Sequence, residues 1–541
     1  MTPQGAILEF AKMISQDLAR GKPVRAALEA AGMMAQAGAM PDVVACLISE
    51  ASKKRPADRI VHACCFLLQA GLDDLRIAVN GGNTAARTRL KEACDAVEKS
   101  VTARSLAPQI PMLIARSFAQ AGVEPPPGLQ AAMIAGLEAG HAEQLALEDD
   151  STLLEQLVPL AEALDHDPFA IHAELSATGA AFPADHRAAM AAELAASTTA
   201  SIRDAALGFL LDADPAPGLA VLETLVAEAR QQPAPSRLIE RLVCLRPWLP
   251  PERQAKLDAS IRSLRANAAA PEPAPQVGII KLLASLCDGA GAQSLFAVLK
   301  IGRRFALSSV LIKADTGIAD AWLRDGMSER ETNDAVREIS DMAEAVTVPI
   351  SFAQTLLADA LATNLAKRIP PPFALLQFTE ALGLGLILPA AMPPARLAAE
   401  SLASLPATQT GAEASAAAHA AAKYWFVQFD TVQTWFEAGE EIEALLAPLP
   451  KTGARVMAAI LAHLFDRRLY WAARCAWMAA TLKDSDHRCR AEWRNFALVA
   501  RDLAGTEHLS DTTLFQIIAD GTNQAFKANA PRRRPTERKR R

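Results

Sequence analysis

The stretch from Ser294 to Asp325 decides how the middle of this chain is interpreted. It reads Ser-Leu-Phe-Ala-Val-Leu-Lys-Ile-Gly-Arg-Arg-Phe at 294–305 and Leu-Ile-Lys-Ala-Asp-Thr-Gly-Ile-Ala-Asp-Ala-Trp-Leu-Arg-Asp at 311–325. Lysine, arginine, aspartate, glycine and tryptophan stand there among apolar residues in an order that simple amphipathicity does not require. Because alanine-rich, helix-forming sequence surrounds it, we interpret the stretch as a helix–turn–helix corner.

In this interpretation 295–300 ends one helix, 303–313 forms a buried second helix, and Asp315 or Thr316 caps a third. Charges beside a buried helix need partners, and Lys313 can pair with Asp315 or Asp320. Two interpretations stay open: a polar network that fixes helix register, and a site for an anionic ligand or a protein partner. The candidate binding residues are Arg303, Arg304, Lys313, Asp315, Asp320 and Trp322.

The composition outside this stretch predicts an all-α fold. Aromatic residues make up only 5% of the 541 residues, and alanine, which has the highest helix propensity, is abundant. Short helices with one broad apolar face, such as 24–38 and 151–164, follow one another between short turns. We expect antiparallel helix pairs stacked into an α-solenoid, with a separate C-terminal helical unit.

The helix pairs recur every ~35–45 residues, which resembles the spacing of HEAT and armadillo repeats. No strict consensus passes from pair to pair, so the resemblance concerns architecture alone. It implies a curved stack of helices with a concave groove. A set of compact helical domains is the alternative.

Breaks in composition divide the chain. Three prolines in the segment 266–276 end any helix there, and a second boundary falls at 405–415. The expected parts are a helical array at 1–265, a middle helical region at 277–405, a tryptophan-rich helical unit at 421–529 and a disordered basic tail at 530–541. The aromatic residues of the third part either pack as its core or form a docking patch.

Charge is unevenly placed along the chain. The net charge is -6, and the tail from 531 to 541 carries seven basic residues and one acidic residue, a local +6, so the body carries -12 (-6 minus +6). Each phosphate bound by the tail would steepen salt dependence, although no aromatic residue accompanies it for base stacking. The candidate nucleic-acid contacts are Arg532, Arg533, Arg534, Arg538, Lys539, Arg540 and Arg541.

Catalytic and metal-binding patterns are missing from the sequence. It contains no G-x-S-x-G, P-loop, G-x-G-x-x-G or H-E-x-x-H motif, and its histidines and cysteines match no zinc spacing. We therefore expect no catalytic residues, no metal and no cofactor. Eight scattered cysteines indicate reduced thiols, and the longest apolar run is broken by proline and glycine. The sequence predicts a cytoplasmic protein without membrane contact.

These features favour a non-enzymatic scaffold or adaptor of bacterial type that binds a protein partner along a groove. A nucleic-acid-associated helical-repeat protein that uses its basic tail is the alternative. An enzyme ranks third, because no catalytic set can be assembled from the residues.

Overall fold

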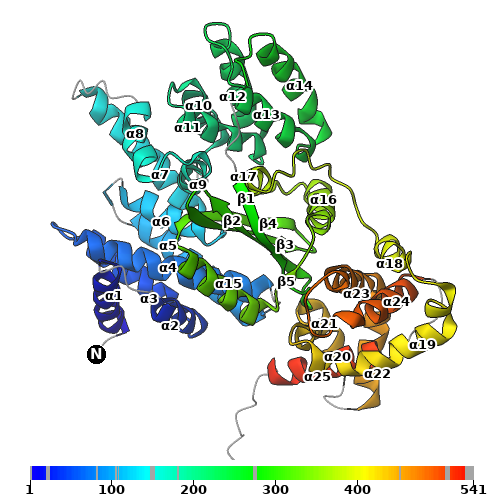
Figure 1. Ribbon diagram of the computed structural model, residues 1–541. Coiled ribbons are helices and arrows are strands. Elements are labelled where there is room, and N and C mark those ends of the chain that lie inside the picture. Colours follow the sequence, from blue (N-terminus) through cyan, green and yellow to red (C-terminus); the bar gives the residue numbers. More distant parts are fainter. Residues whose placement is uncertain are drawn as a thin grey trace, which may run out of the picture. The chain divides into compact units, whose positions relative to one another are not determined.

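The computed structural model describes residues 3–19, 25–80, 83–103, 106–107, 109–146, 153–179, 182–271, 277–449, 453–505 and 512–529. The chain forms two compact units, one made of Met1–Phe209 with Ala216–Thr224 and the other of Leu210–Pro215 with Leu225–Arg541. It is mostly helical, but the predicted all-α class is wrong. The second unit contains a five-stranded antiparallel sheet, shown in green in Figure 1.

The first unit is helical throughout its described residues. Its elements are α1 (Pro3–Ala19), α2 (Arg25–Gln36), α3 (Met40–Ala51), α4 (Asp58–Asn80), α5 (Thr84–Ala103), α6 (Gln109–Gln120), α7 (Pro127–Ala146), α8 (Leu153–Ala163), α9 (Pro168–Gly179), α10 (Ala184–Ala196) and α11 (Ala200–Ala205). The 3-10 helix η1 (Ala206–Leu211) and α12 (Pro215–Glu228) contribute residues to both units.

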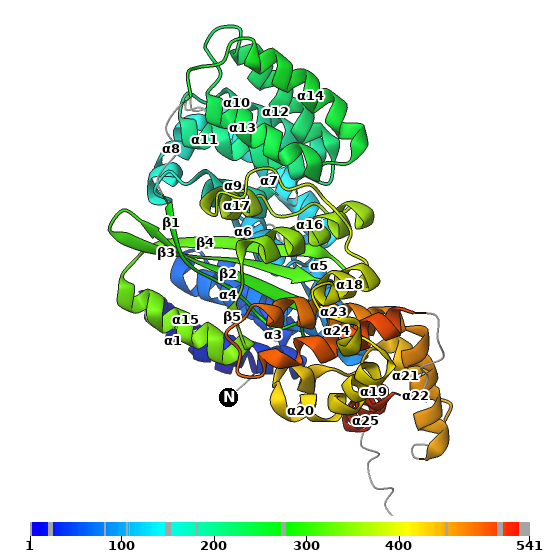
Figure 2. The ribbon, with the colours of Figure 1, turned by 45° about the vertical axis from the view of Figure 1, so that its right-hand side comes forward.

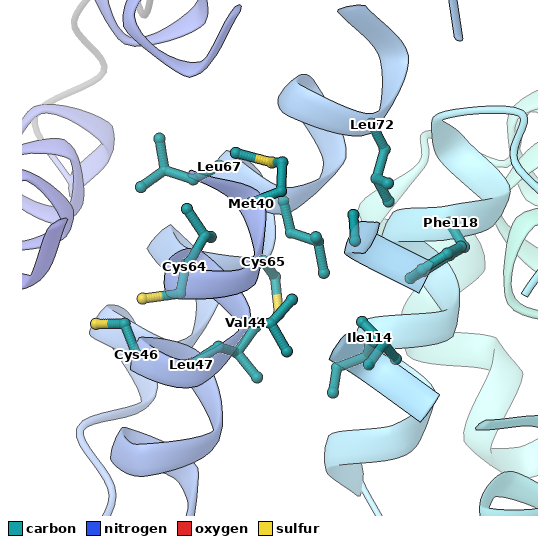
Figure 3. Close-up of a cluster of buried hydrophobic side chains, with 14 of the residues drawn as sticks. Met40, Val44, Cys46, Leu47, Cys64, Cys65, Leu67, Leu72, Ile114 and Phe118 are labelled. Carbon is teal, nitrogen blue, oxygen red and sulfur yellow. The ribbon is translucent and has the colours of Figure 1, made fainter. Parts of the chain in front are cut away.

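Helix α4 is the centre of the first unit. It packs against α1, α2, α3, α5 and α6, that is, against the helices that directly precede and follow it in the chain. Figure 3 shows side chains of α3, α4 and α6 meeting in a core that includes Leu47, Leu67 and Phe118.

Gly71 explains how α3 approaches α4 so closely. A Cβ atom at Gly71 would meet the Met40 sulfur at 2.3 Å, so any larger residue there would force the end of the methionine side chain to move. Helix α4 therefore runs through this glycine to Asn80, rather than ending at it as glycine often indicates. At Gly122, by contrast, φ is +65° and α6 ends as such a residue predicts.

The second unit surrounds the sheet with helices. Its helices before and beside the sheet are α13 (Ser236–Leu245), η2 (Arg246–Trp248), α14 (Pro251–Arg265), α15 (Glu329–Ala343), α16 (Ile350–Lys367), α17 (Ala374–Ala381) and α18 (Pro394–Leu402). The later ones are η3 (Ala407–Gln409), α19 (Ala412–Ala421), η4 (Ala422–Tyr424), α20 (Trp425–Gln428), η5 (Thr431–Thr434), α21 (Glu440–Leu446), α22 (Ala454–Asp466), α23 (Arg468–Lys483), η6 (Arg490–Glu492), α24 (Trp493–Ala504) and α25 (Thr513–Asn529).

The strands lie in the order β4-β3-β2-β1-β5, all antiparallel. They are β1 (Val277–Ala284), β2 (Ala292–Ile301), β3 (Arg304–Lys313), β4 (Gly317–Met327) and β5 (Val346–Thr347). The predicted helix–turn–helix corner is therefore wrong, and the middle region is helical only from α15 onward. That stretch is a β-meander.

Two short loops make the meander possible. Ile301 pairs with Arg304, so Gly302 and Arg303 form a two-residue loop, and Gly302 has φ +59°. A glycine with positive φ at the first loop position matches the twist of a hairpin. Lys313 pairs with Gly317 across the three residues 314–316. What resembled a helix terminus and a helix cap in the sequence are two hairpin turns.

Helices cover both faces of the sheet. In Figure 2, α16 and α17 lie above it and α15 lies below it, and the packing of α16 and α17 on β4 and of α15 on β3 agrees with this view. Because strands covered on both faces lose the alternation of apolar and polar residues, β3 is buried continuously from Ala306 to Val310.

The C-terminal helices enclose an aromatic core. Trp425, Trp435 and Trp471 are fully buried, and Trp425 stacks on Phe496 with ring centroids 3.7 Å apart. Tyr424 beside them is exposed. Most of these aromatic residues therefore form a core and not a docking patch.

No single helix among the described residues is long and apolar enough to cross a membrane, while the bent pair Ala27–Gln36 and Met40–Ala51 passes that test only when its two helices are taken together.

Candidate binding surface at the free end of the sheet

One end of the sheet is held firmly by the C-terminal helices. The loop between β1 and β2 accepts hydrogen bonds there: Trp435 Nε1 donates to the Cys287 carbonyl at 3.1 Å, and the Tyr470 hydroxyl donates to the Gly289 carbonyl at 2.8 Å. The amide of Gly289 donates in turn to the Thr434 hydroxyl at 2.9 Å. We call this the anchored end of the sheet.

Arg474 packs against the β1–β2 loop at the anchored end. Its guanidinium lies 3.3 Å from the centre of the Tyr470 ring and donates to the Ala290 carbonyl at 3.1 Å. The side chain is almost wholly buried, and a Cβ atom at Gly291 would meet its guanidinium nitrogen at 1.9 Å. Burial raises the pKa of the neighbouring Cys287 thiol to about 12, so that thiol stays protonated and inert. The anchored end is structural.

The opposite end of the sheet is open. We call it the free end and define it by 277–281 of β1, 300–301 of β2 and the turn at 302–304. Three isoleucines are exposed there: Ile279 by 41%, Ile280 by 56% and Ile301 by 37%. Val277 pairs with Ile301 across the two strands, so Ile279, two residues along β1, faces the same side of the sheet as Ile301, and Ile280 is the extra residue at the register shift beside it. Exposed apolar residues grouped together indicate a binding surface.

Basic residues surround the three isoleucines. Lys300, Arg303 and Arg304 are all exposed, and Lys300 lies directly across from Gly278 in the β1–β2 register. Arg304 donates a hydrogen bond to the Gly326 carbonyl of β4. The free end therefore combines an apolar centre with cations in a chain whose net charge is negative.

The acidic groups of this end lie on its far side, at β4 and the start of α15. Ser328 caps α15 and forms a capping box with Glu331. Hydrogen bonds from Ser328 lower the pKa of the Glu331 carboxyl, and Arg324 and Arg304 lower it further. Strands β2 and β3 separate this acidic side from β1. On the β1 side, Asp486 lies close enough to Lys281 for that lysine to lower the pKa of its carboxyl, so the positive charge of the free end comes from Lys300 and Arg303.

The six residues proposed from the sequence do not form one site. Arg304 and Lys313 mark the two ends of β3, nine residues apart, which places them roughly 30 Å from each other. Lys313 and Asp315 belong to the anchored end, because Lys313 pairs with Ala292. Within the described residues, Lys313 forms no ion pair with Asp315 or Asp320. Only Arg303 and Arg304 belong to the free end.

Asp320 and Trp322 lie on β4, the opposite edge of the sheet. Asp320 accepts a hydrogen bond from the Ala321 amide at 2.9 Å, and Trp322 is 40% exposed. Asp320, Arg324 and Asp325 are exposed along this edge, and its pairing with β3 shifts register twice. Charges and bulges are devices that keep an edge strand from pairing with another chain. This edge is protected against strand pairing.

Sequence reasoning missed Gly278, Ile279, Ile280, Lys300 and Ile301. A signal was present: the run Val277-Gly278-Ile279-Ile280 directly follows a proline-rich segment, and β-branched residues after such a boundary indicate a strand. The seven basic residues of the tail, 532–541, lie outside the described residues.

A serine, a histidine and an aspartate also meet among the C-terminal helices. The Ser415 hydroxyl donates to Asp502 Oδ2, and His419 Nε2 lies 3.3 Å from the same oxygen. In a nucleophilic triad the serine must hydrogen-bond to the histidine, whereas here both contact the carboxylate. Arg501 completes the cluster at 2.9 Å from Asp502 Oδ1. We interpret it as a polar joint between α19 and α24.

A second polar joint links α15 to the C-terminal helices. The Glu344 carboxylate accepts hydrogen bonds from the amide and the hydroxyl of Thr431, each at 2.7 Å, and His487 Nε2 lies 3.8 Å away. Burial raises the pKa of the Glu344 carboxyl, but His487 and Thr431 outweigh burial and lower that pKa to about 2. Among the described residues no group of three or more potential ligands could hold a metal ion.

Together these features describe a mostly helical protein whose antiparallel meander is anchored at one end and open at the other. Three family models match separate segments of the chain. The Y4lR N-terminal domain matches residues 13–126, the Y4lR second domain matches 183–268, and the Y4lR C-terminal helical domain matches 395–527. All five strands fall between the second and third matched segments.

The chain is similar to the uncharacterized protein y4lR of Sinorhizobium fredii (strain NBRC 101917 / NGR234). The two are 25% identical over 323 residues, which is 59% of this chain and 61% of the relative. The match therefore spans less than two thirds of the relative's length. No solved structure matches the chain.

Proposed function

We propose that this protein is a non-enzymatic adaptor that binds a protein partner through the free end of its sheet. One observation supports this most directly: Ile279, Ile280 and Ile301 are exposed together beside Lys300 and Arg303. Such a surface has the composition of a protein interface, with an apolar centre and a charged rim. The groove of an all-α helical stack no longer belongs to the proposal, because the second unit contains a five-stranded sheet.

The polar clusters of the second unit support a binding role over a catalytic one. Ser415, His419 and Asp502 hold helices together, as do Glu344 and His487. A cytoplasmic location is part of the proposal. All eight cysteines are free, which suits a reducing compartment.

Affinity capture of the tagged full-length protein from cells of its source organism tests the proposal. An Ile280→Asp variant places a charge at the centre of the free end, and a Val427→Asp variant serves as its matched control. Val427 is 82% exposed and belongs to α20, so this control makes a similar change at a distant apolar residue.

We expect a protein partner that survives nuclease treatment, is retained by Val427→Asp and is lost with Ile280→Asp. Thermal melting of both variants checks that they remain folded. A partner set that is identical for the two variants would refute the proposal. Capture that disappears with nuclease, or on deletion of the residues after Asn529, would instead favour nucleic-acid binding through the basic tail.

A further inference from the structure

The two edges of the sheet differ in their backbone pairing. At the β1 edge, β5 pairs only with Leu283 and Ala284. Within the described part of the chain, the backbone groups of 277–281 pair with β2 alone, so this segment has a free outer edge. Peptide N–H and C=O groups on such an edge hydrogen-bond readily to another extended chain.

The side chains at this edge do not protect it as those of β4 do. Gly278, Ile279 and Ile280 are exposed, and the only charge in the segment is the half-buried Lys281. The register shift between Ile279 and Lys281 interrupts the ladder with β2. It limits any added strand to a short pairing and so opposes open-ended association, and it leaves the regularly paired residues 277–279 as the main part of the free edge.

We propose that the edge of β1 from Val277 to Lys281 takes up an extended acidic segment of a partner protein as an additional strand. This inference rests on the proposed function and specifies the partner's chemistry. The added strand continues the line that β5 begins, and backbone hydrogen bonds supply affinity while alternate side chains supply specificity. Apolar residues of the segment cover Ile279 and Ile280.

The absence of a side chain at Gly278 is the reason we expect the partner's segment to be acidic. It has no side chain, and a Cβ atom built there would lie 3.8 Å from the Lys300 Cβ atom. A residue added opposite Gly278 therefore faces Lys300 across a gap of two strand spacings, about 10 Å. A glutamate and a lysine side chain span that gap together, so a glutamate at this position pairs with Lys300.

Electrostatic repulsion also disfavours a second copy of this chain as the source of the added strand. Two β1 edges paired antiparallel would bring Lys281, Lys300 and Arg303 of one copy toward the same residues of the other. Like charges that face each other across an interface disfavour it and suppress that pairing. The same cations attract an acidic segment. Because they are exposed, salt screens this attraction, and binding weakens as the salt concentration rises.

The test uses the full-length chain and a fluorescein-labelled peptide, Val-Glu-Val-Glu-Val-Glu-Val. We expect a Kd on the order of 10–100 µM at low salt from fluorescence anisotropy, with slower amide hydrogen exchange in 277–281. A fully N-methylated peptide keeps its side chains but cannot donate backbone hydrogen bonds, so its binding should be lost. A charge-swap pair tests the register: Lys300→Glu should bind the peptide about 10-fold more weakly and should bind Val-Lys-Val-Lys-Val-Lys-Val instead. Lys423→Glu, a reversal at an exposed lysine of η4, should change neither affinity.

Each other outcome overturns the inference. Equal binding of the N-methylated peptide, or unchanged exchange in 277–281, would exclude strand addition. Sedimentation that shows a dimer disrupted by Ile280→Asp would assign the edge to a second copy. If cellular capture still depends on Ile280 while the peptide fails these tests, the adaptor function stands and the strand addition does not. If capture is indifferent to Ile280, the proposed function itself fails.

Discussion

Asn364 makes the most specific prediction about the stability of the second unit. This buried side chain of α16 hydrogen-bonds to the turn between β3 and β4: its Oδ1 accepts from the Ile318 amide at 2.8 Å, and its Nδ2 donates to the Thr316 and Ile318 carbonyls at 3.1 and 3.2 Å. It also donates to the Ile369 carbonyl at 3.1 Å. One side chain thus joins the meander to its covering helix.

An Asn364→Leu variant keeps most of the volume and removes every hydrogen bond. Thr316 and Ile369 are partly or fully exposed, so water can satisfy their carbonyls. Ile318 is 1% exposed, and its N–H and C=O both lose their partner. Each buried unsatisfied group costs about 1–3 kcal/mol, so we expect the two groups of Ile318 together to lower the free energy of unfolding by about 4 kcal/mol. Asn364→Asp should cost more, because a carboxylate would face three carbonyl oxygens.

Tryptophan fluorescence during urea unfolding is the appropriate assay, because all seven tryptophans lie in the second unit. Its transition therefore reports that unit alone. Lys367→Leu, an exposed change three residues along the same helix, is the matched control and should leave the midpoint unchanged. A change below about 0.5 kcal/mol for Asn364→Leu would refute this account, since surface substitutions alone produce effects of that size.

Three further predictions concern other contacts of the second unit. Trp435→Phe removes the hydrogen bond to the Cys287 carbonyl and leaves a small cavity, so we expect a loss of about 2 kcal/mol by the same unfolding assay, and an unchanged midpoint would contradict the anchoring role. The folded-state pKa of Glu344 is lowered from 4.5 to about 2, so its contribution of about 3 kcal/mol is present above pH 4.5 and is lost as the pH falls toward 2. Glu344→Gln should therefore flatten the acid limb of a stability–pH profile, and a limb of unchanged slope would argue against the contact. Arg241 donates to both oxygens of Glu380 at 2.7 and 2.9 Å, so Arg241→Leu should cost about 2 kcal/mol, and failure of the double variant with Glu380→Leu to recover stability would show that the pairing is not the cause.

The helical part of the fold could be predicted from the sequence, because caps and breakers act locally. Gly122 ends α6 as its sequence position indicates. Gly71 does not end α4: it lacks the positive φ of Gly122, and Met40 of α3 packs beside it. A close approach between two helices depends on tertiary packing. No local sequence pattern therefore distinguishes a glycine that permits such packing from one that ends a helix.

The sheet could not be predicted from hydrophobic periodicity. Residues 306–310 are buried on both faces, so they show neither the alternation of a half-buried strand nor a helical stripe. Two local signals remained in the sequence, Gly302-Arg303 between apolar runs and Val277-Gly278-Ile279-Ile280 after the prolines. The alanine-rich surroundings favoured a helix over both. Arg303 and Arg304 were proposed as binding residues from the sequence, but their neighbours in space depend on strand order, which those signals do not determine.

The contrast between the two ends explains how the sheet can keep a free edge without losing its register. A strand with an open edge is prone to slip, and a slip of one residue would move every side chain of β1 to the other face. Hydrogen bonds from Trp435 and Tyr470 fix the loop that follows β1, so the register is set at the anchored end. Residues 277–281 can then adjust locally to a partner while the remainder of the strand stays in place, because opening at a strand end costs far less than global unfolding.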